Sequence, residues 1–561
     1  MGERTRLGLG VLGVALVLGG LGDILLRATP WGINFLIWVT AIVGLAIWLA
    51  RWGRVGTRGE GKWLIFVALV FAAGVVLRDS PFVVFLDLLG VLSSLSLAIR
   101  LGRSGSLRRA GILDCVLGGV YTGALTSAGP IPVSVVDIEW REAVRGRWKG
   151  QALAVSRGVL LAAPLLLLFG TLLVAADAIF ERLIIEVFGF DLAEVFSHLF
   201  LLTFFAWITA GLLWAGLMAR VPEDFAIPRP RILSLGIVEV GIVLGLLDLL
   251  FLTFVVIQVR YLFGGAWRVA ATAGLTYAEY ARRGFFELVT VTALALPLLL
   301  IAHWLLRTET RAHERLFKAL AGIMVILLFV VVASALQRMY LYQQEFGLTE
   351  LRLYTTILMV WISVILLWFV LTVLRARRDR FAFGALLAGF IAIFAINVMN
   401  PDALIASTNI DRMENGKRFD AYYLTTLSAD AVPVLVASLP EIGDTRLWKD
   451  YTLEQAVVDR WDSRQVDWRT WNLGRSRARQ LVRRHVEDQN VRAFRMISFD
   501  SRHQDKAFMH RPDRVIHNML WIRCSQRGIS GASVTSSLQR GFRFQDVNST
   551  TSERCSARTT G

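Results

Sequence analysis

Cysteine is scarce in this sequence, which has three cysteines in 561 residues: Cys115, Cys524 and Cys555. They are far apart and form no C-x-x-C pair, so their spacing argues against a structural zinc site and against a disulfide framework. Cys524 and Cys555 lie in the polar C-terminal tail, where a disulfide between them requires an extracytoplasmic location. We therefore expect no bound metal.

The sequence also lacks the short motifs of common enzyme classes. It has no Walker A loop, no H-E-x-x-H zinc motif and no G-x-S-x-G nucleophile elbow. A G-x-G-x-x-G pattern occurs at Gly8–Gly13, but it lies inside an apolar run with no preceding strand. Dinucleotide binding by this pattern needs a strand–turn–helix unit, so we interpret the match as accidental and expect no cofactor. No internal repeat typical of an inverted-repeat transporter is evident either.

Long polar stretches are absent from the first 399 residues. Hydrophobic residues make up 55% of the chain, charged residues 19%, and the mean hydropathy is +0.55. Uncharged runs of about 20 residues, long enough to cross the bilayer core, recur from Leu7 to Met399. This pattern predicts an all-α, polytopic transmembrane helical bundle. The net charge of +16 does not indicate nucleic-acid binding, because basic residues of membrane proteins gather in cytoplasmic loops.

We predict about eleven membrane spans. They are residues 7–26, 31–50, 63–77, 81–99, 153–177, 196–219, 232–258, 285–306, 317–338, 354–374 and 381–399. The third is short for a full crossing. The segment 111–125 is too short and too interrupted by glycine to cross, and we interpret it as interfacial.

The loops between the spans predict their orientation. With the N-terminus in the cytoplasm, the cytoplasmic segments hold about three times as many lysines and arginines as the opposite set. An odd number of spans then places the C-terminal region outside the cytoplasm. The basic, tryptophan-bearing end of loop 100–152 fits a helix on an anionic leaflet, but an ordinary basic cytoplasmic loop explains it more simply.

Composition divides the chain into five parts. We expect four N-terminal spans in 1–99, a cytoplasmic loop in 100–152 and about seven spans in 153–399. Residues 400–484 read as a small helical extracytoplasmic domain, in which Thr452 and Gln455 predict a capping box at a helix start. Residues 485–561 are rich in Arg, Ser, His and Gln without apolar periodicity, which predicts disorder.

Asp248 is the clearest ionisable residue within a predicted span. Such residues are costly in lipid and normally face the bundle interior. Gly241 and Gly245 form a small-residue face that favours close helix contact, and Asp248 falls on the same face at 100° per residue. Two readings remain open for Asp248: proton or substrate coupling, and a structural interhelical hydrogen bond.

A second group of candidates precedes and enters the span 285–306. Thr276 and Glu279 occupy capping-box positions, so a helix is predicted to start at Thr276. Glu279, Arg283 and Glu287 then follow at i, i+4 and i+8 on one helix face. A capped interfacial helix explains most of this pattern. It does not explain the pair Arg282–Arg283, on the side of the membrane where basic residues are few.

The sequence resembles the bacterial membrane proteins grouped as domain-of-unknown-function families 4153 and 4173. The resemblance covers about residues 110–440. It rests on four segments that occur in order: "LLDLLFLTFVVIQVRYLFGGAWRV", "GLTYAEYARRGFFELVTVTALALPLLL", "YLYQQEFGLTELRLY" and "NVMNPDALIASTNIDR" followed by "FDAYYLTTLSADAVPVL". The resemblance implies a many-span fold in the bacterial cell membrane, and it implies no activity and no catalytic residue.

Three function classes fit these observations. The first is a transporter or channel-like protein, with Asp248 and the segments near 274–287 and 339–353 along its pathway. The second is a membrane enzyme acting on a lipid-linked or envelope substrate at the outer face. Its candidate residues are Glu279, Arg283, Glu287, Glu345, Asn400 and Asp402. The third is a scaffold or sensor that binds an envelope protein through residues 400–484. The lipid bilayer is the expected partner in all three.

Overall fold

The structure is a computed structural model of the whole chain. It describes residues 2–55, 61–104, 112–140, 192–219, 235–262, 285–306, 310–375, 377, 380–417, 419–448, 451–462 and 467–503, with isolated positions in 158–177. The chain divides into two compact units, Met1–Val486 and Glu487–Gly561. The fold described below is that of the first unit.

The described part of the chain is an all-α helical bundle with nine helices long and apolar enough to cross a membrane. They are α1 (Glu3–Leu26), α2 (Ile33–Trp52), α4 (Pro81–Ser104), α10 (Leu192–Leu217), α11 (Ile237–Leu262), α14 (Phe285–Leu305), α15 (Arg311–Phe346), α16 (Glu350–Thr372) and α17 (Phe381–Met399). α3 (Gly61–Leu77) is apolar but shorter, as the sequence predicted. Ten of the eleven predicted spans thus coincide with described helices, and the span 153–177 lies largely outside the described residues.

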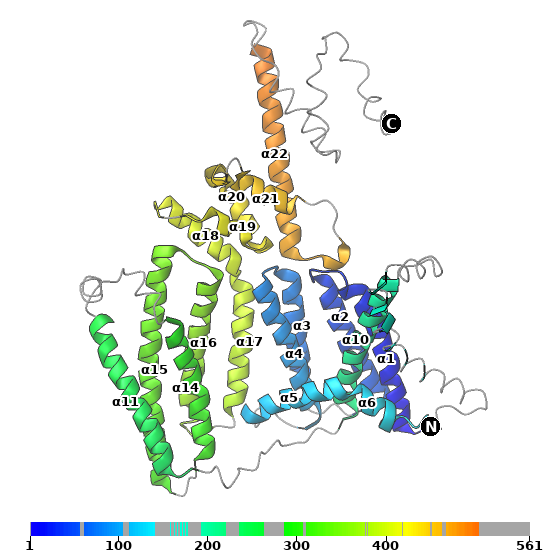
Figure 1. The fold of residues 1–561 in the computed structure, drawn as a ribbon, viewed down its shortest axis with the longest axis vertical. Helices are drawn as coiled ribbons and strands as arrows, with labels where there is room; N and C mark the ends of the chain where they lie inside the picture. The colour runs from blue at the N-terminus through cyan, green and yellow to red at the C-terminus, as the bar shows by residue number, and fades with distance from the viewer. Residues whose placement is uncertain are drawn as a thin grey trace, which may run out of the picture. The chain divides into compact units, whose positions relative to one another are not determined.

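The spanning helices form two groups connected by α17 (Figure 1). In the first group, α1 packs on α2 and α10, and α3 packs on α2 and α4. In the second, α15 packs on α11, α14 and α16. α17 contacts α16 on one side and α4 on the other. We call the end of the bundle where α1, α3, α15 and α17 finish the domain side, and the opposite end the far side.

The apolar side chains separate into cores that follow these groups. The first core joins α1–α4 and α10 and contains Leu18, Leu49 and Leu64, each fully buried. The second joins α11 and α14–α17 around Phe317, Met324 and Phe369. Many large apolar side chains on the outward faces remain exposed, for example Leu246 and Leu250 on α11. Such exposure is typical of lipid-facing helix surfaces rather than of a soluble bundle.

Helix α5 (Ile112–Ala128) lies across the far side of the first group instead of along it (Figure 1). Its direction agrees with the interfacial segment predicted at 111–125. The chain then turns through α6 (Pro130–Pro132) into a π-helix, η2 (Val133–Asp137). Asp137 at its end binds Arg4 at 2.7 Å and accepts a hydrogen bond from the Trp214 indole at 2.6 Å, which fixes this turn to α1 and α10.

The described residues of the C-terminal domain are helical apart from one short hairpin. It contains α18 (Pro401–Glu414), α19 (Ala421–Thr426), the 3₁₀ turn η5 (Ala429–Ala431), α20 (Val432–Ile442), α21 (Leu453–Trp461), the 3₁₀ turn η6 (Trp468–Thr470) and α22 (Leu473–His503), with antiparallel strands β1 (Arg446–Trp448) and β2 (Tyr451–Thr452). The capping box is confirmed: Thr452 Oγ1 accepts from Gln455 N, and the Gln455 side chain accepts from Thr452 N.

The predicted boundary at 484 falls within α22, close to the division between the two compact units at Val486 and Glu487. The helix itself continues without a break to His503. Residues 485–503, for which the sequence predicts disorder, are helical; most of them are polar or charged, with apolar residues such as Phe494 and Ile497 among them. The predicted disorder of residues 504–561 falls outside the described residues.

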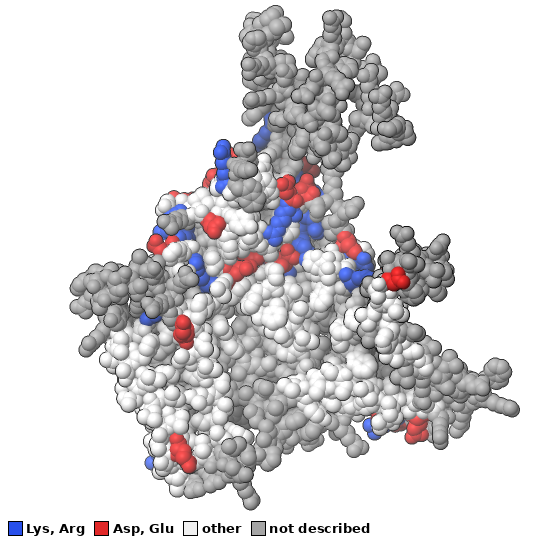
Figure 2. All heavy atoms as spheres, in the orientation of Figure 1, with Lys and Arg blue, Asp and Glu red and all other residues white. Residues whose placement is uncertain are grey.

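Charged residues are distributed differently over the spanning helices and the C-terminal domain. On the face seen in Figure 2, the spanning helices are almost free of Lys, Arg, Asp and Glu, and these residues gather over the C-terminal domain. The 36-residue α15 ends at this border, where cations bind its last carbonyl oxygens. Arg412 donates to Gln343, Gln344 and Glu345, and Arg352 donates to Phe346 and Gly347. These bonds satisfy carbonyls that a helix end leaves without partners and complement the negative end of its dipole.

Candidate functional site

Asp248 lies near the middle of α11, on the face that packs against α15. Its side chain is 7% exposed, and neither carboxylate oxygen has a hydrogen-bond partner among the described residues. Leu244, one turn earlier, is fully buried in the second core. Ten residues later, Gln258 accepts a hydrogen bond from Ser334 across the same interface at 3.2 Å. The burial predicted for Asp248 is therefore observed, and among the described residues its carboxyl accepts no interhelical hydrogen bond.

The neighbouring glycines make no close contact with a described helix. A Cβ atom at Gly241 would meet only Leu320 Cδ1, at 4.0 Å, and one at Gly245 would meet no described atom within 4 Å. Neither glycine therefore permits a close approach to a described helix. The packed face of α11 instead consists of Val240, Leu244, Asp248 and Val255.

A second buried carboxyl, that of Asp87, lies between α3, α4 and α17. Asp87 is fully buried; its Oδ1 accepts a hydrogen bond from Asn397 Nδ2 at 2.7 Å, and its Oδ2 has no partner among the described residues. Gly74 makes room for it, because a Cβ there would lie 2.4 Å from Asp87 Oδ2. Asp87 is not among the residues predicted from the sequence, although an aspartate in the apolar run "FVVFLDLLGV" is the same signal that identified Asp248.

A third carboxyl in a spanning helix, that of Asp23 in α1, has partners. Its Oδ2 lies 2.6 Å from His198 Nδ1 on α10, and Arg27 Nε lies 3.9 Å from its Oδ1. Asp23 therefore joins α1 to α10 through its hydrogen bond with His198. This contact distinguishes it from Asp248, which no described cation approaches.

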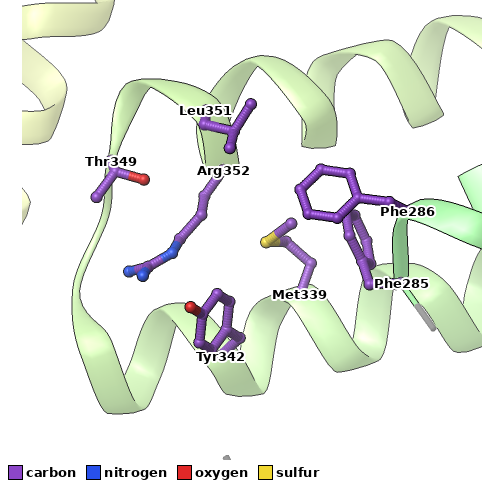
Figure 3. A pocket seen from close by; sticks show the side chains of 7 residues that line it. All are labelled: Phe285, Phe286, Met339, Tyr342, Thr349, Leu351 and Arg352. Atoms are coloured by element: carbon purple, nitrogen blue, oxygen red, sulfur yellow. The ribbon is translucent and has the colours of Figure 1, made fainter. Parts of the chain in front are cut away.

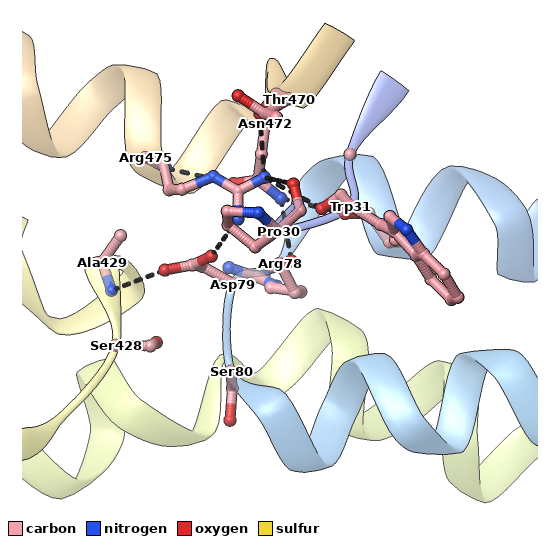
Figure 4. A network of polar contacts seen from close by, with 12 residues as sticks. Pro30, Trp31, Arg78, Asp79, Ser80, Ser428, Ala429, Thr470, Asn472 and Arg475 are labelled. Atoms are coloured by element: carbon pink, nitrogen blue, oxygen red, sulfur yellow. Dashed lines mark hydrogen bonds and ion pairs between the residues drawn. The ribbon is translucent and has the colours of Figure 1, made fainter. Parts of the chain in front are cut away.

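The loop between α3 and α4 holds the C-terminal domain to the bundle (Figure 4). Asp79 in this loop accepts a hydrogen bond from Ala429 N at 3.3 Å and binds Arg475 Nη1 at 2.8 Å. In return, Asp430 accepts from the backbone N–H groups of Asp79 at 2.7 Å and Ser80 at 3.3 Å. We call Arg78, Asp79, Ser80, Asp430 and Arg475 the clasp.

Arg475 is the hub of the clasp. It is 7% exposed, and its Nη2 donates to the carbonyl oxygens of Pro30, Trp31 and Thr470. Asn472, fully buried one turn earlier, donates to the carbonyls of Val75 and Arg78 at the end of α3. The start of α22 thereby supplies hydrogen bonds to backbone carbonyls at two turns of the bundle, where water would otherwise supply them. These bonds attach the C-terminal domain firmly to the bundle.

Burial raises the pKa of both aspartates in the clasp. The pKa of Asp430 rises to about 6 because the carboxyl is removed from water, and its hydrogen bond from Asp79 N and the nearby Arg78 only partly offset this effect. The pKa of Asp79 is raised for the same reason against the opposing charge of Arg475. Ionising either carboxyl in this position is therefore costlier than in water.

Asn400 and Asp402, both predicted as candidates, lie where α17 passes into α18 beside the clasp. Asn400 adopts a left-handed conformation with φ 54°, which turns the chain from one helix into the next. Asp402 is fully buried; its Oδ2 accepts from Ser428 N at 3.1 Å, and its Oδ1 has no described partner. Its carboxyl also interacts with that of Glu350 at the start of α16. Both residues thus belong to the junction between domain and bundle.

The other predicted candidates lie apart from these sites or outside the described residues. Glu279, Arg282 and Arg283 fall outside the described part of the chain, as does the predicted helix start at Thr276. Glu287 lies exposed in the first turn of α14. Among the described residues, no group of three or more His, Cys, Asp or Glu side chains is arranged to hold a metal ion.

These features define a polytopic all-α membrane protein whose C-terminal helical domain is joined to the bundle by buried polar contacts. The sequence model of the family described as "Domain of unknown function (DUF4153)" matches residues 65–438, more than half of the chain, and the protein belongs to this family. The expected resemblance is confirmed, and the match begins well before residue 110, within α3. No curated protein and no solved structure matches the chain.

Proposed function

We propose that the protein is a proton-coupled transporter of the bacterial cell membrane, in which the Asp248 carboxyl binds and releases the proton. The observation that carries this proposal is the burial of both carboxylate oxygens at mid-span without a described partner. An unpaired carboxylate charge inside a membrane costs several kcal/mol, and a bound proton removes that charge. Release of the proton then requires water or a cation to reach Asp248, and hence a change in the packing of α11.

The packing of α11 favours such a change. Among the described helices its principal contact is with α15, and most of its other apolar side chains are exposed. The helices of the first group are held differently, since α1 packs on both α2 and α10 and bears the Asp23–His198 contact. A movement of α11 against a fixed first group would let a buried site open alternately to the two sides, as alternating access in transporters requires.

The proposed orientation keeps the N-terminus in the cytoplasm and the C-terminal domain outside. The far side carries basic residues at the ends of successive spanning helices, including Arg51, Lys62, Arg311 and Arg377. A basic bias in short loops supports a cytoplasmic far side. In this orientation a proton reaches Asp248 from the domain side under the usual bacterial proton gradient.

A pH-jump experiment tests the proton step without knowledge of the substrate. Proteoliposomes with the full chain are adsorbed to a solid-supported membrane, and transient current is recorded when the external pH falls. Wild-type protein is expected to give a charge displacement, Asp248→Asn to give none, and Asp248→Glu to retain it in part. A current in Asp248→Asn equal to that of wild type would overturn the proposal.

Labelling with dicyclohexylcarbodiimide provides a second readout. This apolar reagent enters the bilayer and modifies carboxyl groups that carry a proton. Mass spectrometry is expected to find the adduct on Asp248 and to find less of it as pH rises. The amount of adduct on Asp248 is compared with that on Asp87, whose Oδ1 is hydrogen-bonded to Asn397. Absence of the adduct at Asp248 at every pH contradicts the proposed role.

A further inference from the structure

A cavity of about 270 Å³ opens at the domain side of the second group (Figure 3). It lies between the first turn of α14, the last turns of α15 and the first turn of α16. Its lining residues are Phe285, Phe286, Met339, Tyr342, Thr349, Leu351 and Arg352. Met339 lies between the two phenylalanines and Tyr342, and the Arg352 guanidinium extends toward Tyr342 (Figure 3). The walls are thus apolar or aromatic, with one cation among the lining residues.

Arg352 keeps part of its hydrogen-bonding capacity unused. Its Nη1 donates to the carbonyls of Phe346 at 3.1 Å and Gly347 at 2.6 Å, and the guanidinium lies 4.1 Å from the centre of the Tyr342 ring. Among the described residues, its Nε and Nη2 make no hydrogen bond, and no carboxylate forms an ion pair with it. A guanidinium held in place on one edge and free on the other is suited to bind a carboxylate or phosphate.

The start of α16 adds to this suitability. Thr349 is the N-cap residue, but its side chain makes no capping hydrogen bond. Because Thr349 and Leu351 line the cavity, the positive end of the helix dipole lies at its edge; the Glu350 N–H in this turn donates to the Tyr423 hydroxyl at 2.8 Å. Glu350 is the one acidic residue in this turn, and it does not line the cavity, because its carboxyl interacts with Asp402 in the junction instead.

The apolar wall opens onto the lipid-facing surface. Phe286 is 50% exposed and Leu351 63% exposed, whereas Phe285 and Met339 behind them are buried. A chain that enters from the bilayer therefore meets apolar side chains first and the cation at the aqueous end. The volume is slightly below the usual range of small-molecule sites, about 300–1,000 Å³, and suits an acidic headgroup with the first part of an alkyl chain.

We infer that this cavity binds an anionic amphiphile, with its phosphate or carboxylate on Arg352 and its alkyl chain against Phe286, Met339 and Leu351. The inference names the substrate class of the proposed transporter, and in calling the bound molecule a substrate it rests on the proposed function. Binding itself does not require transport, so the two can be tested apart.

Photo-crosslinking tests the site. The full chain in phosphatidylcholine nanodiscs is labelled with dodecyl phosphate bearing a diazirine on the alkyl chain. The adduct is expected on peptides containing Phe286, Met339 or Leu351. Unlabelled dodecyl phosphate should compete, and dodecanol and inorganic phosphate at the same concentration should not. Equal competition by inorganic phosphate, or labelling spread over other spans, would overturn the inference.

Arg352 and Arg412 both donate to the last carbonyls of α15, and variants of these two residues separate ligand binding from helix capping. Arg352→Gln removes both a cap and the proposed ligand group, and we expect about tenfold less labelling. Arg412→Gln removes a cap from the same helix end but does not line the cavity, and labelling should remain at the wild-type level. Met339→Trp fills the cavity while leaving both arginines, and should also abolish labelling. Equal labelling of both arginine variants contradicts the site.

Asp248→Asn distinguishes this inference from the proposed function. It should be labelled as wild type is, while losing the pH-jump current. If Asp248→Asn loses the current and the expected labelling is absent, the proposed function is supported and the substrate class is wrong. If the labelling is as expected and the current is unchanged, the binding site is supported and the proposed function is wrong.

Discussion

Asp79 and Asp430 each accept hydrogen bonds from the backbone around the other. Asp430 binds the N–H groups of Asp79 and Ser80, and Asp79 binds the N–H of Ala429. The two residues are 351 positions apart in the chain. Because each carboxyl replaces water at the other's turn, neither turn can separate from its partner without leaving buried donors unsatisfied. The reciprocal contact therefore makes the C-terminal domain part of the membrane bundle's own fold.

Removing Asp79 is predicted to destabilise this junction. Asp79→Ala leaves the buried Arg475 guanidinium without its carboxylate, a change that typically costs about 3–5 kcal/mol. The matched control is Asp467→Ala, which breaks the exposed pair Asp467–Arg469 and should have little effect. Thermal unfolding of the detergent-solubilised chain measures both. Similar midpoints for the two variants would show that the buried pair does not hold the domain.

Stability is predicted to depend on pH through Asp430. Its pKa is about 6 in the folded protein, against an ordinary value of 3.8. A raised carboxyl pKa contributes stability that is fully present below about pH 4 and lost as pH rises through 6, on the order of 3 kcal/mol in total. The raised pKa of Asp79 acts in the same direction.

The measurement compares wild type with Asp430→Asn between pH 4.5 and 7.5. The wild-type unfolding midpoint should fall with rising pH relative to that of the variant, which has no charge to gain at this position. A difference that does not change over this interval, or that grows with pH, refutes the assignment to Asp430.

The cationic cap of α15 predicts a third effect. Arg412→Gln removes hydrogen bonds to the last carbonyls of this helix and should cost about 1–3 kcal/mol, with faster hydrogen exchange in residues 343–348. Lys417→Gln, which loses a single exposed bond to Gln344 at 3.3 Å, should change exchange much less. An equal response to both substitutions would mean that the carbonyls are satisfied by water in either case.

What the sequence could predict depended on how far apart the interacting residues lie. The spanning helices follow from apolar runs, and the capping box from Thr452 and Gln455, three positions apart; both patterns are local. The burial of Asp248 followed from helical periodicity on one element. By contrast, Asp79 and Arg475 are 396 positions apart, and nothing in either segment marks the other as its partner.

Two features of the sequence were less informative, for different reasons. Gly241 and Gly245 share a face, but a small-residue pattern permits close helix contact without requiring it, and a Cβ at Gly241 would meet only Leu320, at 4.0 Å. The continuation of α22 beyond 484 was not predicted because polar and charged residues predominate in 485–503. The position of Asp87 in an apolar run could be recognised from the sequence, but its hydrogen bond with Asn397 of α17 could not.

The contact between α1 and α10 provides the last prediction, because two consecutive glycines in α1 meet different surroundings. A Cβ at Gly19 would lie 2.6 Å from the Leu202 carbonyl oxygen and from Ala206 Cβ, whereas one at Gly20 would meet no described atom within 4 Å. Alanine favours helix over glycine by about 1 kcal/mol at either position. Gly20→Ala should therefore be neutral or stabilising, and Gly19→Ala should lower the unfolding midpoint because α10 must move away. If both substitutions raise the midpoint, then α1 and α10 are not in the close contact on which the first group depends.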